Sequence, residues 1–364
     1  MKLFYDEVIN TGRQKELDWA RGFAVLFMIL VHVKMELPGF PLSDTYSRVI
    51  EFLGSPLAAP TFMILLGVGI VYSKNKDPKK QAVRGVKLLI LHYILNFTAF
   101  GIPSLIRFIL TQDTAYCYDI LMLTFSVDIL AFSGLTFLFF ALMQKLKFNH
   151  VHIILITLAF SCLNYILTIP VENLWLQPIT GLFVCTSEIS FFPFLSWIGY
   201  PVMGYIFADL LIRCSDKRKF YRILFASSVL ITAAVTLGAR KYGFDIWSMH
   251  FGPGEYYYQD FIQYILVGGI CFSWISILFA LSEIKGLTIV GKQLARWSKN
   301  TTVIYFAQWM IIGWLYIMEP IKFPANIAAN LILGIAISIL SDVSAILYQK
   351  AVDSIRRKRS RILT

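Results

Sequence analysis

Charged residues are scarce in this chain: they occupy 15% of its 364 positions, whereas hydrophobic residues occupy 57%. Soluble globular domains use about 25% charged residues, so this composition excludes an ordinary soluble domain. Apolar runs of about 18 residues or more, long enough to cross a bilayer, recur along the whole chain. The sequence therefore predicts an all-α integral membrane protein that crosses the membrane many times.

Cysteine and histidine are equally rare, with five residues of each. The cysteines are scattered without paired spacing, and most lie in apolar runs, which indicates small buried side chains rather than a disulfide framework. No pair of cysteines or histidines has the spacing of metal ligands, so we expect no metal site.

Ten membrane-spanning helices with both termini in the cytoplasm are expected from the hydropathy and the loop charges. A short N-terminal segment (1–17) precedes the transmembrane domain (18–349), and a basic cytoplasmic tail (350–364) follows it. We place the ten helices at roughly 18–37, 53–73, 88–110, 120–143, 150–169, 191–212, 222–238, 261–281, 302–318 and 327–349.

Lysine and arginine are absent from alternate loops; none occurs, for example, between Lys147 and Arg213. By the positive-inside rule, the loops that are rich in these residues face the cytoplasm, and so do both termini. The net charge of +11 follows from this asymmetry, so we expect no nucleic-acid partner. Membrane lipid is the expected partner of the basic tail.

The first membrane-sized run contains three polar residues that are costly to keep in lipid: Asp18, Arg21 and His32. Arg21 and His32 are eleven residues apart, so on a helix they share one face and lie about 16 Å apart along the axis. One interpretation is structural, with Asp18 as a first-turn acid, Arg21 as its i,i+3 partner at the interface, and His32 as a satisfied core residue. We favour a functional His32, because an imidazole there can move protons or attack an acyl group.

Leu17-Asp-Trp-Ala-Arg-Gly-Phe-Ala24 followed by His32 resembles the first-helix signature of the acyltransferase-3 membrane family. That family is part of a wider transmembrane acyltransferase superfamily with heparan-glucosaminide N-acetyltransferase-like proteins. Three further stretches are similar to motifs of this superfamily: 60–69, Arg84-x-x-Lys87 and 191–204. In a late helix, many family members carry a histidine where this chain has Gln308, which cannot titrate.

This resemblance implies a membrane-bound acyltransferase that moves an acyl group, commonly acetyl, from cytoplasmic acetyl-CoA or another acyl-CoA to an acceptor at the outer face. The acceptor is often a saccharide or glycolipid, and the setting is the bacterial cytoplasmic (inner) membrane. His32 is the expected catalytic residue. Donor binding or positioning is assigned to Arg21, Asp18, Arg84 and Lys87, since arginine and lysine neutralise phosphate charges.

The acceptor could bind at an aromatic outer loop that carries Trp247, His250, Glu255 and Tyr257. Aromatic faces with flanking polar groups suit sugar rings, although an interfacial aromatic belt explains the loop equally well.

Two buried charges and one amide are assigned to a structural or polar pocket. Arg107 lies inside the outer half of a predicted span and needs a partner there. We favour an ion pair with Asp128, with Glu36 and Glu188 as alternatives, and we add Gln308 to the polar positions.

The sequence leaves open the mechanism of the acyltransferase and two alternative functions. His32 could form a covalent acyl intermediate or act as a general base. A secondary transporter of a small solute is compatible with ten spans and helices interrupted by glycine and proline. A structural subunit or flippase for envelope lipids would explain the aromatic loop but not Arg21 with His32. The sequence leaves a homo-oligomer open.

Overall fold

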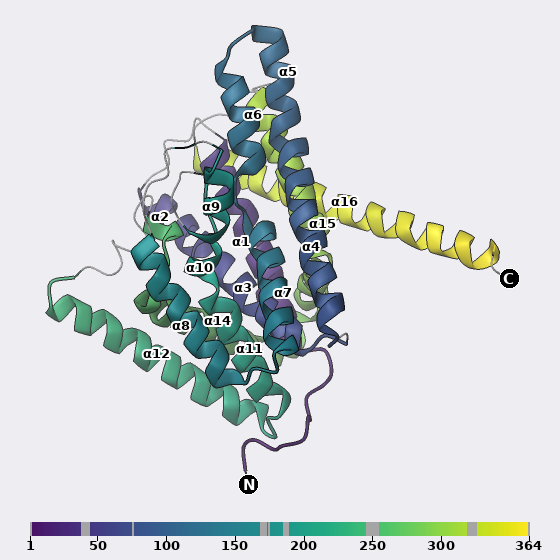
Figure 1. The fold of residues 1–364 in the computed structure, drawn as a ribbon. Coiled ribbons are helices and arrows are strands. Elements are labelled where there is room, and N and C mark those ends of the chain that lie inside the picture. Colours follow the sequence, from purple (N-terminus) through teal and green to yellow (C-terminus); the bar gives the residue numbers. More distant parts are fainter. Residues whose placement is uncertain are drawn as a thin grey trace.

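A computed structural model describes residues 2–37, 44–74, 76–167, 173, 175–184, 189–244, 255–318 and 326–362. Within these ranges the chain forms helices and no β-strand, apart from two isolated bridges, Phe4–Cys214 and Val127–Ser190. The helices pack into one bundle, with the N-terminus at one end and the turn between α5 and α6 at the other (Figure 1).

The helices and their bounds are α1 (Lys15–Glu36), α2 (Asp44–Gly54), α3 (Ala59–Val71), α4 (Pro78–Asn96), a π-helical turn η1 (Phe97–Gly101), α5 (Ile102–Thr111), α6 (Ala115–Phe125), α7 (Ile129–Lys145), α8 (His150–Leu167), α9 (Gln177–Phe183), α10 (Phe194–Trp197), α11 (Gly199–Ile212), α12 (Lys217–Lys241), a 3₁₀ turn η2 (Glu255–Tyr257), α14 (Phe261–Ser282), a 3₁₀ turn η3 (Lys285–Leu287), α15 (Thr288–Met318) and α16 (Ile327–Ile362).

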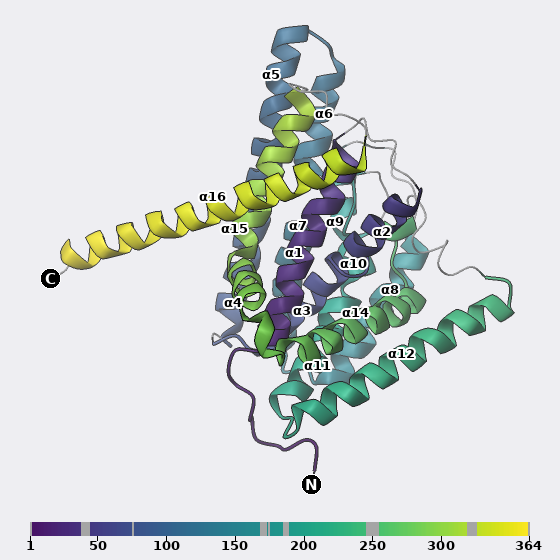
Figure 2. The same ribbon diagram turned by 180° about the vertical axis from the view of Figure 1, so that it is seen from behind.

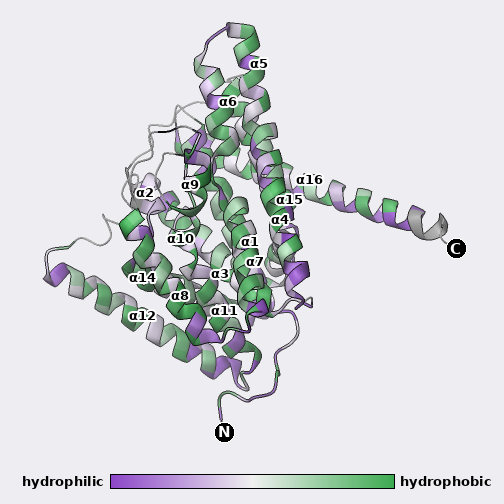
Figure 3. Ribbon diagram, in the orientation of Figure 1, coloured by the Kyte–Doolittle hydropathy of each residue, from purple (hydrophilic) through white to green (hydrophobic). Residues whose placement is uncertain are grey.

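Eight helical segments of the described chain are long and apolar enough to cross a membrane. They are Thr45–Val71, Pro78–Thr111, His150–Leu167, Phe194–Ile212, Lys217–Lys241, Phe261–Ser282, Lys285–Met318 and Ile327–Lys358. The predicted all-α polytopic membrane fold is therefore confirmed, whereas ten spans and cytoplasmic termini stay predictions. Hydrophobic residues predominate along the middle of the helices, and hydrophilic residues gather at the end of the bundle near the N-terminus (Figure 3).

Several of the expected spans are not single helices, and two of them contain a clear break. Span 53–73 is interrupted between α2 and α3, where Pro56 lies, and span 120–143 is interrupted between α6 and α7. At the second break, Asp128 caps α7 by accepting hydrogen bonds from the backbone amides of Leu130 (2.8 Å) and Ala131 (3.2 Å). The break survives among apolar helices because these caps satisfy the free amides.

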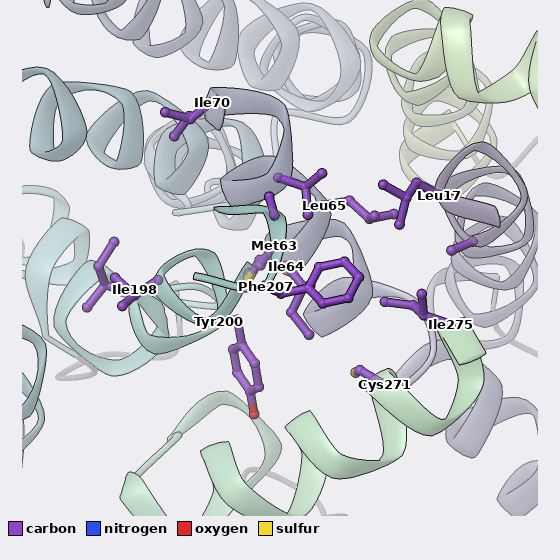
Figure 4. Packing of buried hydrophobic residues seen from close by; sticks show 14 of the residues in the cluster. Leu17, Met63, Ile64, Leu65, Ile70, Ile198, Tyr200, Phe207, Cys271 and Ile275 are labelled. Carbon is purple, nitrogen blue, oxygen red and sulfur yellow. The ribbon is translucent and has the colours of Figure 1, made fainter. Parts of the chain in front are cut away.

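The largest buried core surrounds α3 and α11. Trp197 and Tyr200 are fully buried there, and Figure 4 shows Tyr200 and Phe207 beside residues of α3 and α14. Gly67 and Gly204 let α3 and α11 approach so closely that a Cβ atom at either would overlap a backbone carbonyl of the other helix. This core fixes α3, which forms one wall of the cavity described below.

Replacing Gly204 by alanine is expected to destabilise the bundle, because its methyl group would overlap the carbonyl oxygen of Ile64. Overpacking of this kind costs about 1–3 kcal/mol, more than the roughly 1 kcal/mol that alanine gains over glycine in a helix. Thermal unfolding in detergent would measure the change. Gly69→Ala is the control, since a Cβ there meets nothing within 4 Å; equal midpoints for the two variants would contradict the expectation.

Two long helices lie at the edge of the bundle. α12 runs along one side, and the C-terminal half of α16 projects away from the other helices in both views (Figures 1 and 2). The first half of α16 packs on α15 and α1. The site lies on the opposite side of α1, among α3, α4, α7 and α15.

Candidate functional site

A cavity of about 510 Å³ lies between five helices, α1, α3, α4, α7 and α15. Its lining changes from charged to apolar along its length. Arg21, Arg84 and Lys299 line the end nearer the N-terminus, together with Arg13 and Asp18. Met28 lies two turns beyond Arg21 on α1, and Leu130 lies in the first turn of α7. The cavity therefore offers cations at its mouth and an apolar interior.

The two arginines at the mouth are held without a carboxylate. Arg21 donates a hydrogen bond from Nη2 to the backbone oxygen of Leu65 (3.1 Å), and the guanidinium of Arg84 lies 4.4 Å from the centre of the Phe137 ring. Neither forms an ion pair with a described residue. Both retain hydrogen-bond donors that an anionic ligand can use.

Asp18 has a different partner from the one expected. Its carboxylate binds Arg13, on the segment before α1, and accepts a hydrogen bond from the Ser298 hydroxyl (2.7 Å). The hydrogen bond to Asp18 raises the pKa of Arg13. Asp18 and Arg21 form no direct i,i+3 ion pair, because Arg13 reaches the carboxylate from outside the helix, although the charge of Asp18 still acts on Arg21. Asp18 ties the N-terminal segment to α1 and α15.

Lys87 and Arg84 do not enter the cavity together. Arg84 lines it, and one turn later the lining residue on α4 is Leu88, whereas Lys87 does not line it. Both Arg84 and Lys87 are exposed overall. Positions three apart on a helix differ by about 60° in direction, and that difference separates the two side chains here. The structure thus supports Arg84 as a cavity cation and gives Lys87 no such position.

His32 lies just beyond the cavity. It does not line the cavity, but it follows Met28 by one turn on the same face of α1, about 6 Å along the axis. Its Nδ1 is 3.2 Å from Nε2 of Gln308, and its ring centre is 4.2 Å from that of Trp309. Gln308 is fully buried, and its Oε1 atom has no partner among the described residues.

Asp128 joins a polar cluster that the sequence did not reveal. Its Oδ1 atom is 2.7 Å from Nδ1 of His92, and its Oδ2 atom accepts a hydrogen bond from the hydroxyl of Tyr305 (2.9 Å). Tyr305 lines the cavity, so this cluster forms part of its wall. From the sequence, we favoured a structural role for His92. The one feature that could have indicated a site residue is that it is a second histidine within an apolar run.

The expected ion pair between Arg107 and Asp128 was wrong. Arg107 donates hydrogen bonds to the hydroxyl of Tyr116 (3.1 and 3.2 Å) on α6. Asp128 is turned toward α4 and α15 instead, because its carboxylate caps α7 at the break in the expected span. Of the alternative partners, Glu188 lies outside the described residues.

The residues expected to bind the acceptor are described only in part. Trp247 and His250 lie outside the described residues, and the side chain of Glu255 is not described. The ring of Tyr257 contacts Phe191 and Phe192, with centres 5.1 and 6.0 Å apart. Tyr257 therefore belongs to an aromatic cluster, which is compatible with either a sugar site or packing.

No three histidine, cysteine, aspartate or glutamate side chains come together as metal ligands in the described part of the chain. The polar groups of the site are instead guanidinium, imidazole, amide, phenol and carboxylate. Such groups bind anions and transfer protons.

Comparison with known families gives one match. A family model described as heparan-alpha-glucosaminide N-acetyltransferase, catalytic, matches residues 13–250. This range contains the cavity residues of α1, α3, α4 and α7, whereas Tyr305 and Gln308 lie beyond it. A search of curated proteins finds no match.

Proposed function

The chain belongs to the heparan-alpha-glucosaminide N-acetyltransferase family, and from this premise we propose that it transfers an acetyl group from acetyl-CoA to a saccharide acceptor across the membrane. The family makes it a membrane acetyltransferase. The donor, the acceptor and the part played by His32 are our proposal. The match favours a transferase over the solute transporter considered above.

The cavity between the five helices carries this proposal. Coenzyme A has several phosphate charges at one end and a slender arm with the thioester at the other. Arg21, Arg84 and Lys299 supply cations where the phosphates would bind, and the interior beside Met28 suits the apolar part of the arm. The loop charges assign this mouth to the cytoplasmic side, where acyl-CoA is available.

His32 is positioned to act where the cavity ends. As a general base, its Nε2 would accept the proton of the acceptor hydroxyl or amine while that group attacks the thioester carbonyl. The C–S bond then breaks, and the imidazolium gives the proton to the sulfur, so that CoA leaves as its thiol. In the covalent alternative, Nε2 attacks the carbonyl, the C–S bond breaks, and CoA leaves as its thiolate. The acceptor hydroxyl or amine then takes the acetyl group from the imidazole, and its proton is released to the thiolate. The acceptor approaches from the opposite membrane face.

Gln308 fits either route. An amide can present its oxygen or its nitrogen to Nδ1 of His32 by turning about its last bond. Its oxygen would accept a hydrogen from Nδ1 and leave Nε2 unprotonated, which both routes require. Since a glutamine cannot take the proton itself, His32 is the group that we expect to titrate.

Filling the cavity is expected to weaken donor binding. Gly69 lines the cavity, and no atom lies within 4 Å of the place where its Cβ would be. Gly69→Leu would place four carbons there, and we expect the affinity of purified protein for acetyl-CoA to fall by about tenfold or more, the cost of a lost contact of roughly 1.4 kcal/mol. Calorimetric titration in nanodiscs would measure it.

Gly238→Leu is the matched control, because this glycine on α12 also has an open Cβ position but lies away from the cavity. It should bind acetyl-CoA as the wild type does. If the wild-type protein binds no acetyl-CoA, or if Gly69→Leu binds it with unchanged affinity, the proposed donor site is wrong.

A further inference from the structure

Three polar side chains, from α4, α15 and the N-cap of α7, meet behind the wall of the cavity. His92 on α4 and Tyr305 on α15 both contact Asp128, the residue that caps α7. His92 is completely buried, and Tyr305 is 5% exposed. Ionisable groups at this depth in a membrane protein are costly and usually serve a function.

The cluster stands directly behind the cavity wall. Tyr305 is itself a lining residue, and the helix positions adjoining the other two also line the cavity: Leu88 lies one turn before His92, and Leu130 follows Asp128 by two positions. A ligand that fills the interior would therefore touch Tyr305 but neither Asp128 nor His92. The phenol is therefore the group through which this cluster can contact a ligand.

The hydrogen bonds fix what the phenol of Tyr305 can do. The carboxylate of Asp128 accepts hydrogen bonds only, and four donors surround it: the amides of Leu130 and Ala131, His92, and the Tyr305 hydroxyl. Because Tyr305 gives its single hydrogen to Asp128, its oxygen can only accept hydrogen bonds from other groups. The indole N–H of Trp309 approaches this oxygen, and its remaining lone pair is left for a ligand. Tyr305 therefore acts as a hydrogen-bond acceptor toward a ligand.

Stabilising the break between α6 and α7 does not require these contacts. The backbone amides already satisfy the capping role of Asp128, and Asn96 on α4 separately binds the carbonyl oxygen (2.9 Å) and hydroxyl (3.2 Å) of Ser126 at the same break. The bonds from His92 and Tyr305 come in addition. Their common effect is to hold the phenol in one orientation.

We infer that His92 and Asp128 position Tyr305 so that its oxygen accepts a hydrogen bond from an amide N–H of the donor, next to the thioester. This inference rests on the proposed function, since the arm of coenzyme A carries a secondary amide two carbons from its sulfur. Tyr305 is a donor-binding residue, and Asp128 and His92 are positioning residues that act through it.

A pair of small donors isolates this one hydrogen bond. The acetyl thioester of N-acetylcysteamine carries the same amide beside the thioester, and its analogue with an ester oxygen in place of N–H lacks the hydrogen. The wild-type protein is expected to use the amide donor several-fold better in kcat/KM, as the loss of one neutral hydrogen bond predicts. Tyr305→Phe should use both donors equally well.

The positioning residues require a second set of variants. His92→Leu is expected to reduce the preference for the amide donor, and His92→Asn, which restores a donor toward Asp128, should recover part of it. Asp128→Asn keeps an N-cap side chain but can turn its NH₂ toward the phenol, so the preference should also fall. In each case the change should appear in KM more than in kcat.

Two results would overturn the inference in distinguishable ways. If Tyr305→Phe changes both donors by the same factor, or lowers thermal stability with the preference intact, the cluster is structural and only this inference fails. If the wild-type protein neither binds acetyl-CoA nor uses either small donor, both the proposed function and this inference are wrong.

Discussion

Replacing His32 by alanine is expected to abolish nearly all acetyl transfer while leaving acetyl-CoA binding close to that of the wild type. General acid–base catalysis contributes about 10²–10⁴-fold in rate, and a nucleophilic role would make the loss at least as large. Binding should survive because His32 does not line the cavity; the last α1 residue that does is Met28. The measurement is kcat and KM with acetyl-CoA and a saccharide acceptor.

The matched control for this change is His152→Ala. His152 is an exposed histidine at the start of α8, where it contacts only Asn149 and Phe148 among the described residues. It should leave kcat unchanged. Full activity in His32→Ala would remove His32 from the mechanism, because no water-exposed group could replace an imidazole at that depth.

Mass spectrometry after brief exposure to labelled acetyl-CoA would separate the two routes through His32. A labelled wild-type protein and an unlabelled His32→Ala variant indicate the acyl-imidazole intermediate. An inactive His32→Ala variant with no label on the wild type indicates the general base. Gln308→Leu extends the test, because either route needs Nδ1 of His32 to donate its hydrogen to the amide oxygen of Gln308, and leucine offers no acceptor there.

Much of the fold could be predicted from the sequence because lipid imposes simple rules. In lipid, the backbone N–H and C=O groups of an apolar run must form hydrogen bonds within the run, which predicts a helix. Because the first helix is uninterrupted, Arg21 and His32 share one of its faces. The break before Asp128 could not be predicted in this way. Hydropathy averages over the run, whereas the break depends on one carboxylate that caps α7 and meets partners from α4 and α15.

The position of a site residue could be predicted where it depends on the geometry of a single helix. It could not be predicted where it depends on how several helices pack together. Arg84 and Lys87 look equivalent on α4, and only the packing of α4 against α7 shows that Arg84 faces the cavity. The contact of His32 with Gln308 joins residues 276 positions apart. Gln308 was recognised as unusual for the family but could not be assigned to His32 without the structure.

The difference between Arg84 and Lys87 leads to the second large effect. Arg84→Ala is expected to raise KM for acetyl-CoA by about 10- to 100-fold, since hydrogen bonds to charged groups contribute roughly 1.5–3 kcal/mol. Lys87→Ala, which removes an equal charge one turn away at a position that does not line the cavity, should change KM little. Arg21→Ala should resemble Arg84→Ala, with a further loss of stability from its bond to Leu65.

The donor itself supplies the decisive control for the arginines. The acetyl thioester of N-acetylcysteamine has no phosphate, so Arg84→Ala should leave its KM unchanged while raising that of acetyl-CoA. The effect on acetyl-CoA should also shrink at high salt, because exposed charges are screened within about 3 Å at 1 M. If Arg84→Ala impaired both donors equally, its guanidinium would be supporting Phe137 and the cavity wall rather than binding phosphate. An equal rise in KM for Lys87→Ala would show instead that general surface charge attracts the donor.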